Sequence, residues 1–288
     1  VNIFNLALDL ITLYNWYCQK HTILDMDKKN ISRRDFLKTG ALSTAGLTLA
    51  LGGCAQAKNG RTAAAGEAKN IIFLVSDGMS AGTMALADIV KRNKYGDKTH
   101  WIKLYESDRS YHRGLMDMAS LNSPVPGSAA AASSWGCGHR IVNTAVNMGP
   151  DGEKYKPICQ IFKDAGKSAG LVTTTRITHA TPSGFSINMP SRWQEDDIAT
   201  QHLEREIDVL FGGGRRHFDQ NERDDNRDLF SDFEKNGYQV LRKKADMRNI
   251  NKQKKLLGLF SDSHFPYMVD YNHSKEIQAT TPTLSEMT

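Results

Sequence analysis

The chain has 288 residues, of which 40% are hydrophobic and 24% charged, and its formal net charge is +5. This composition is typical of a globular protein, and the length suffices for one large α/β domain or two smaller ones. The sequence has no basic stripe interleaved with aromatic residues, which argues against nucleic acid binding. It has no apolar run as long as a membrane span. Its cysteines are too few for a disulfide framework or a zinc ribbon.

The N-terminal part of the chain carries an export pattern. Residues 32–38 (SRRDFLK) precede a weakly apolar run that ends at Gly53, and this is typical of a twin-arginine signal. The run closes with Leu-Gly-Gly-Cys54, which resembles a lipobox, although cleavage after Ala57 fits nearly as well. We therefore expect a signal over 26–57 and a mature protein that is periplasmic or anchored to the membrane through a lipid on Cys54.

The segments on either side of this signal contribute little to function. Residues 1–25 precede Met26, ahead of a signal that should be terminal, and we interpret them as an upstream extension from a mis-called start. Residues 58–69 are rich in alanine and glycine and are expected to form a flexible tether. The folded domain is therefore expected over 70–288.

Apolar runs alternate with amphipathic segments throughout 70–288. The run at 70–76 is continuous, as expected of a buried parallel strand. Alternating strands and helices predict an α/β fold with a doubly wound, mostly parallel sheet and helices on both faces, with its chemistry beyond the carboxyl ends of the strands. The expected strands are 70–76, 113–118, 168–175, 207–211, 238–241 and 256–260, and the expected helices are 80–93, one beginning near residue 128, 157–166, 195–206 and 225–236.

Ser128 lies where an extended segment passes into a helix. Pro124 and Pro126 hold the incoming chain extended, and the four alanines after Ser128 are strong helix formers. Backbone N–H groups and the positive end of the helix dipole converge at such a start and favour a bound phosphate, or a serine oxygen that carries one. Taken alone, the stretch is explained as well by a serine that caps the helix.

Four patterns in order along the chain resemble those of alkaline phosphatases, and the resemblance runs from about Lys69 to the last residue. Residues 71–79 resemble the first metal-ligand strand of the family, 126–130 its nucleophile turn, and 173–182 its magnesium segment. Arg192, eleven residues beyond Thr181, stands where the family has its substrate-binding arginine. Residues 197–201 and 208–215 resemble the next helix and strand of the family.

The resemblance implies an exported phosphomonoesterase that uses two zinc ions and one magnesium ion. Asp77 would bridge a zinc and the magnesium, and Ser128, activated by zinc, would attack phosphorus and form a phosphoserine. Thr181 would be a magnesium ligand, and Arg192 would bind two phosphate oxygens. His179 would act through bound water, because imidazole is not a preferred magnesium ligand.

Each of these residues also has a plain structural explanation. Asp77 could be a turn aspartate, His179 a hydrogen-bonded loop histidine, and Arg192 a solvated arginine ahead of a helix. The glycines at 212–214 are expected to form a tight turn that leaves a strand. The other histidines, His264 among them, lack a ligand pattern.

The sequence departs from the family pattern in two places. Gly127 stands where the family usually has an aspartate that orients the arginine, so we expect a looser grip on phosphate. The chain ends at Thr288, before the region that supplies most zinc ligands and the magnesium glutamate in the family, and the spacings of Asp262 with His264 and of residues 270–273 do not replace them. We expect a C-terminally incomplete domain that folds poorly, because a sheet edge would be bare, and that has little or no phosphatase activity.

Two functions are alternatives to a phosphomonoesterase. An inactive exported lipoprotein could hold phosphate at the Ser128 helix without turnover. A sulfatase or phosphodiesterase of the same superfamily is disfavoured by Arg192 and by the segment at 178–182 (THATP). The expected partner is a phosphomonoester substrate, and a lipid anchor and a second copy of the chain are further candidates.

Overall fold

The computed structural model describes residues 69–107, 112 and 114–288. The chain divides into two units, Val1–Phe73 and Leu74–Thr288, and the fold described here is that of the second. The predictions for the extension at 1–25, the signal at 26–57, the tether and the lipidation of Cys54 lie outside the described residues. Within the described residues, no helix has the length and apolar character needed to cross a bilayer.

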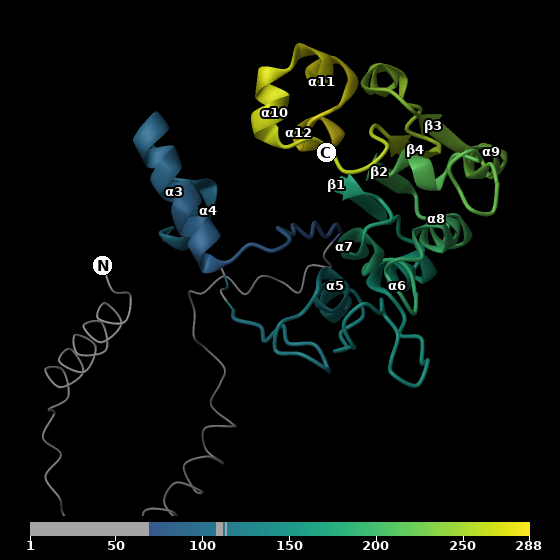
Figure 1. Ribbon diagram of the computed structural model, residues 1–288, viewed down its shortest axis with the longest axis horizontal. Helices are drawn as coiled ribbons and strands as arrows, with labels where there is room; N and C mark the ends of the chain where they lie inside the picture. The colour runs from purple at the N-terminus through teal and green to yellow at the C-terminus, as the bar shows by residue number, and fades with distance from the viewer. Residues whose placement is uncertain (1–68, 108–111, 113) are drawn as a thin grey trace, which may run out of the picture. The chain divides into compact units, whose positions relative to one another are not determined.

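The centre of the unit is a parallel sheet of four strands (Figure 1). Its strands are β1 (Gly170–Arg176), β2 (Val209–Gly213), β3 (Tyr238–Leu241) and β4 (Lys255–Leu259), in the spatial order β1-β2-β4-β3. All three pairings are parallel, and Leu210 lies opposite Leu171 on one side and Leu257 on the other. The four strands expected in these regions are therefore confirmed, with small differences at their ends.

Successive strand residues point to opposite faces of the sheet, and both faces are covered. On one face, Leu210 and Leu257 pack in a core with residues of α8 (Glu195–Glu204) and α9 (Leu229–Lys235). On the other face, Phe211 packs with Met287 of α12 (Leu284–Met287) and Met247 of the 3₁₀ helix η2 (Lys244–Asn249). The expected doubly wound arrangement is confirmed by this alternation.

The other helices surround or precede the sheet. α3 (Ala81–Tyr95) begins after Ser80, whose hydroxyl accepts a hydrogen bond from the N–H of Thr83, and it ends at Gly96 with φ 67°. Both features are common helix boundaries and lie close to the predicted ones. The remaining helices are α4 (His100–Tyr105), α5 (Ser128–Gly136), α6 (Ile158–Asp164), α7 (Ala180–Ser183), η1 (Arg215–His217), α10 (Met268–His273) and α11 (Lys275–Thr280).

Helices α5 and α7 approach so closely that only glycine fits between them. A Cβ atom on Gly136 would lie 1.8 Å from the carbonyl oxygen of Gly184, and a Cβ atom on Gly184 would lie 2.5 Å from the Cβ atom of Ala132. Real Cβ atoms do not approach other atoms this closely. The two glycines therefore set the distance between the helix that carries Ser128 and the one that carries Thr181.

Two of the expected strands are wrong. Residues 70–76 belong to no strand, and the side chains of Ile72 and Leu74 are 82% and 78% exposed. Residues 114–118 form no strand either, and Leu115 is fully exposed. An apolar run becomes a buried strand only where a neighbour pairs with its N–H and C=O groups, and neither run has such a neighbour among the described residues.

Other boundaries also differ from the prediction. Gly212 and Gly213 belong to β2, so the predicted turn at 212–214 is confined to Gly214, whose φ of 90° leads into η1. Helix α9 begins only at Leu229, because the Asp228 side chain accepts a hydrogen bond from the N–H of Ser231 and caps it there. The region after β4, for which no helix was predicted, contains α10.

His202 in α8 makes the stability of the fold depend on pH. Its side chain is fully buried, and its Nε2 lies 3.2 Å from the carbonyl oxygen of Ile177. Burial, partly opposed by this hydrogen bond, lowers the pKa of His202 from 6.5 to about 4. Between these two values only the unfolded chain takes up a proton, so the free energy of unfolding should decrease as the pH falls.

We expect His202 to cost the folded chain about 2 kcal/mol of stability between pH 7 and pH 5. Urea unfolding at the two pH values measures the decrease in the free energy of unfolding. This decrease should be larger, by the amount given above, in the parent chain than in a His202→Gln variant. The glutamine amide can donate to the same carbonyl but does not titrate. Equal losses in both proteins would show that the buried imidazole is not the source.

Candidate functional site

Three oxygen-bearing side chains from distant parts of the chain meet at one point. The Ser128 hydroxyl lies 2.9 Å from Oδ2 and 3.2 Å from Oδ1 of Asp77, to which it donates. The hydroxyl of Thr181 donates to the same Oδ2 at 2.8 Å. Asp77 is exposed and follows the segment at 70–76, in a turn completed by Gly78 with φ 68°. The structure thus brings together three residues that the sequence analysis selected from separate motifs.

Ser128 is the first residue of α5, and its side chain does not cap the helix. The cap position is Gly127, and no side chain accepts a hydrogen bond from the first turn. The explanation of Ser128 as a helix cap is therefore wrong. Its hydroxyl is directed at Asp77 instead, beside backbone N–H groups that lack intrahelical partners.

Arg192 is held by the imidazole of His179. Nη2 of Arg192 lies 2.7 Å from Nε2 of His179. Because guanidinium only donates, Nε2 must carry the lone pair, and the contact of 3.4 Å between Nδ1 and the N–H of Thr181 is then not a hydrogen bond. Burial and then the charge of Arg192 lower the pKa of His179 to about 4, so the ring is neutral.

The backbone of Arg192 is held as well. Its N–H donates to the carbonyl oxygen of Thr144 at 2.8 Å. Thr144 has φ 80°, a conformation that costs a β-branched residue roughly 1–3 kcal/mol. The surrounding structure maintains this strain, and the strained peptide directs its carbonyl oxygen at Arg192.

A buried ion pair supports the segment that carries His179 and Thr181. Arg176, at the end of β1, donates from Nε and Nη2 to the two carboxylate oxygens of Glu195, at 2.7 and 2.6 Å. Thr178 donates to the same carboxylate at 2.6 Å. Burial raises the pKa of Glu195, but hydrogen bonds from His217, Arg176 and Thr178 hold it well below its usual range. The pair joins the end of β1 to the start of α8.

His264 belongs to the same neighbourhood, which its sequence context did not indicate. Its ring lies 5.5 Å from that of His179, nearly at right angles. Its two nitrogens face the backbone N–H and Nη1 of Arg176, at 3.2 and 2.8 Å. Both groups of Arg176 only donate, and a neutral imidazole has one acceptor nitrogen, so only one of these two contacts is a hydrogen bond. His264 and Glu195 belong to none of the motifs, and only the fold places them beside Arg176 and the site.

The donor set fits a magnesium ion in part. The Asp77 carboxylate and the Thr181 hydroxyl are oxygen ligands of the type that magnesium prefers. Zinc prefers histidine, cysteine and carboxylate ligands in a set of three or four. Within 69–107, 112 and 114–288, no three such residues lie close enough together to hold an ion. The described residues therefore do not fit a zinc pair, although Asp77 could serve as one ligand.

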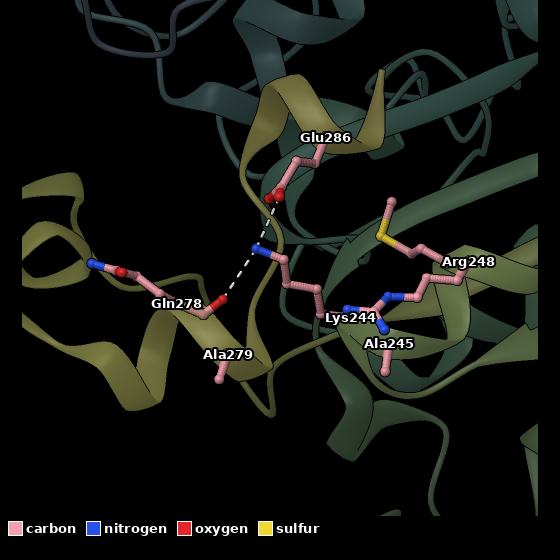
Figure 2. Close-up of a pocket in the computed structure, with 7 residues that line it drawn as sticks. Lys244, Ala245, Arg248, Gln278, Ala279 and Glu286 are labelled. Atoms are coloured by element: carbon pink, nitrogen blue, oxygen red, sulfur yellow. Dashed lines mark hydrogen bonds and ion pairs between the residues drawn. The ribbon is translucent and has the colours of Figure 1, made fainter.

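A separate groove of about 540 Å³ lies between η2 and the C-terminal helices α11 and α12 (Figure 2). Figure 2 shows Lys244 directed between Gln278 and Glu286. Its Nζ lies 3.0 Å from the Gln278 carbonyl oxygen and 2.9 Å from the Glu286 carboxylate, so its charge already has a partner. None of the residues brought together around Asp77 lines this groove.

Two family models match the chain. The family model described as alkaline phosphatase matches residues 68–288, and the model of the twin-arginine translocation signal matches residues 30–50. Alkaline phosphatase 3 of Bacillus subtilis is 34% identical over 231 residues, which are 77% of this chain and 46% of that protein. The chain therefore spans about half the length of the curated relatives that it matches.

Solved structures show the same similarity. The alkaline phosphatase of Thermus thermophilus is 38% identical, with a TM-score of 0.68 over 73% of this chain and 43% of that one. A histidine-to-glutamate variant of TAB5 alkaline phosphatase, solved with magnesium bound, is 26% identical, with a TM-score of 0.56 over 64% of this chain and 51% of that one.

Proposed function

The chain belongs to the alkaline phosphatase family, and from this we propose that it hydrolyses phosphomonoesters through a phosphoserine formed on Ser128. The observation that carries the proposal is the hydrogen bond from Ser128 to Asp77, whose carboxylate also accepts from Thr181. A helix start favours phosphate, and the direction of the Ser128 hydroxyl toward a carboxylate supports a role as nucleophile rather than as cap.

In the proposed reaction, Oγ of Ser128 attacks phosphorus while the bond to the ester oxygen breaks, and the leaving alkoxide takes a proton from solvent water to become the alcohol. Asp77 accepts the hydroxyl hydrogen of Ser128 and so holds the proton that the attack releases. Water then attacks the phosphoserine, phosphate leaves, and Oγ regains a proton. Arg192 presents two parallel N–H donors to the phosphoryl oxygens, where negative charge develops.

Asp77 and Arg192 face the same site. Burial lowers the pKa of Arg192, and the Asp77 carboxylate opposes this shift through its charge. A magnesium ion held by Asp77 and Thr181 would add a positive charge near the phosphoryl group. Because the described residues do not fit a zinc pair, we expect turnover by this chain to be slow.

Three substrates and a chelator test the proposal. The full chain is incubated at alkaline pH with zinc and magnesium and with p-nitrophenyl phosphate, bis(p-nitrophenyl) phosphate or p-nitrophenyl sulfate. We expect hydrolysis of the monoester above that of the other two, and its loss after EDTA. Preference for the diester or the sulfate would contradict the proposed substrate class, and insensitivity to EDTA would contradict metal dependence.

The second candidate is phosphate binding without turnover. It is supported by the neighbourhood of Asp77, which accepts from Ser128 at the start of α5 and whose charge also acts on Arg192. No group of residues that could hold a zinc ion lies within the described part of the chain. Binding of inorganic phosphate by the full chain, without hydrolysis of any of the three substrates, would support this function over the first.

Export by the twin-arginine route follows from the matched signal. We propose a periplasmic protein, or one anchored to the membrane by a lipid on Cys54. Mass spectrometry of the mature N-terminus would distinguish a lipidated Cys54 from cleavage after Ala57. We also propose that the mature protein forms a homodimer, which sedimentation of the mature protein would test.

A further inference from the structure

Trp193 is a large aromatic residue whose place in the structure is not explained by packing. Its side chain is 69% exposed, and none of the buried clusters of the described chain contains it. The centre of its ring lies 5.1 Å from Cζ of Arg192. This distance is within the range of a cation–π interaction, and tryptophan is the aromatic residue that makes the strongest ones.

The direct partners of the Arg192 side chain are neutral. Nη2 donates to the neutral imidazole of His179 at 2.7 Å, and the guanidinium lies by the ring of Trp193. At position 127, glycine supplies no carboxylate, and a Cβ there would meet only Asn143 at 3.7 Å. A carboxylate partner would orient the guanidinium but cancel much of its charge. An imidazole nitrogen and an aromatic ring can orient it and leave the charge for an anion.

One contact cannot fix the plane of a guanidinium group. The hydrogen bond to His179 holds a single nitrogen of Arg192, so the guanidinium plane can still rotate about the axis of this hydrogen bond. A ring beside the guanidinium restricts this rotation. The backbone of Arg192 is itself held by the carbonyl of Thr144, and the N–H of Trp193 lies 3.4 Å from the hydroxyl of Ser191. The arginine and the ring therefore start from a constrained stretch of chain.

We propose that Trp193 is a positioning residue, which together with His179 holds the guanidinium of Arg192 in the orientation that binds two phosphate oxygens. The inference rests on the phosphate-binding role of Arg192 in the proposed function. It assigns to this chain a neutral support for the arginine in place of a carboxylate at position 127.

The first test is the affinity of the full chain for inorganic phosphate, with zinc and magnesium present, by isothermal titration calorimetry. Trp193→Leu should raise the Kd about 2- to 5-fold, the loss expected for an exposed cation–π contact. Trp193→Phe, which keeps an aromatic face, should recover part of that loss. Trp101→Leu, a matched change of a half-exposed tryptophan in α4, should leave the Kd unchanged. Because Trp193 is exposed, its variants should unfold at the temperature of the parent chain.

The second test detects the contact itself and needs no ligand. The Nε–H resonance of Arg192, assigned by its loss in Arg192→Lys, should be shifted upfield by the ring current of Trp193. The shift should disappear in Trp193→Leu and persist in reduced form in Trp193→Phe. A merely structural role of Trp193 would not produce this pattern.

The outcomes separate the inference from the proposed function. The positioning role is overturned if Trp193→Leu binds phosphate as tightly as the parent chain, or if the Arg192 resonance does not move in Trp193→Leu. The proposed function survives either result as long as Arg192→Ala weakens phosphate binding. Equal affinities of Arg192→Ala and the parent chain overturn the phosphate-binding role of the arginine, and the positioning role with it. A full chain that binds no phosphate overturns both.

Discussion

Replacing Ser128 with alanine is expected to abolish the covalent intermediate and to lower p-nitrophenyl phosphate hydrolysis by roughly 10³-fold or more. The reason is specific to the site: Ser128 is the hydroxyl at the start of α5 that is directed at Asp77, at 2.9 Å. An alanine leaves the helix intact, because the cap position is Gly127 and the serine side chain makes no capping hydrogen bond. The loss should therefore be one of chemistry and not of folding.

Two measurements check this expectation. Hydrolysis is followed at alkaline pH with zinc and magnesium, and the chain is quenched in acid after reaction with substrate so that a phosphoryl group on the peptide containing Ser128 can be detected by mass spectrometry. Ser134→Ala is the matched control, because Ser134 lies in the same helix and its hydroxyl donates to the carbonyl of Ala130 at 3.2 Å. A phosphopeptide that persists in Ser128→Ala would assign the nucleophile to another residue.

Replacing Gly136 with alanine is expected to destabilise the fold by about 3 kcal/mol or more, at the upper end of overpacking substitutions. The added methyl group would lie 1.8 Å from the carbonyl oxygen of Gly184, and a backbone atom cannot move aside as the end of a side chain can. The helices α5 and α7 would have to separate, which would also part Ser128 from Thr181. Urea unfolding monitored by circular dichroism measures the loss of stability.

The matched control is Gly82→Ala in α3, where the nearest atom to the new Cβ would be Oγ of Ser80, at 3.5 Å. Alanine has a higher helix propensity than glycine, so this change should stabilise the chain by about 0.5–1 kcal/mol. A Gly136→Ala chain as stable as the parent would show that α5 and α7 do not pack as closely as described. Complete loss of the fold in Gly136→Ala would agree with the expectation. In that case Gly184→Ala should also lose its fold.

The parts of the fold that could be predicted are those with a strong local signal. β1 is rich in β-branched residues, α3 has a serine cap and a closing glycine, and β4 is a short apolar run between polar segments. Of the two strands that were wrongly predicted, 70–76 carries the same apolar signal, whereas 113–118 (RGLMDM) carries it only weakly. Hydrophobicity shows that a segment can be buried, but pairing depends on neighbours that the local sequence does not specify.

The candidate site divides in the same way. Asp77, Ser128, Thr181 and Arg192 lie in short motifs with a recognisable order, so the amino-acid sequence alone is enough to select them. His264, Glu195 and Trp193 could not be selected in this way, because a lone histidine, a first-turn glutamate and an exposed tryptophan are common in any protein. Their positions became informative only through their contacts.

Local pattern was therefore enough to predict the class of fold, because helix caps, β-branched runs and glycine turns act over a few neighbouring residues. Resemblance to known motifs was enough to predict the export signal and to select the candidate site residues. Contacts across the fold decided the rest: that Ser128 is directed at Asp77 and does not cap its helix, and that Arg192 is held by a neutral imidazole. These are outcomes of packing between segments more than ten residues apart, where burial and close approach, set by glycines such as Gly136 and Gly184, determine which side chains meet.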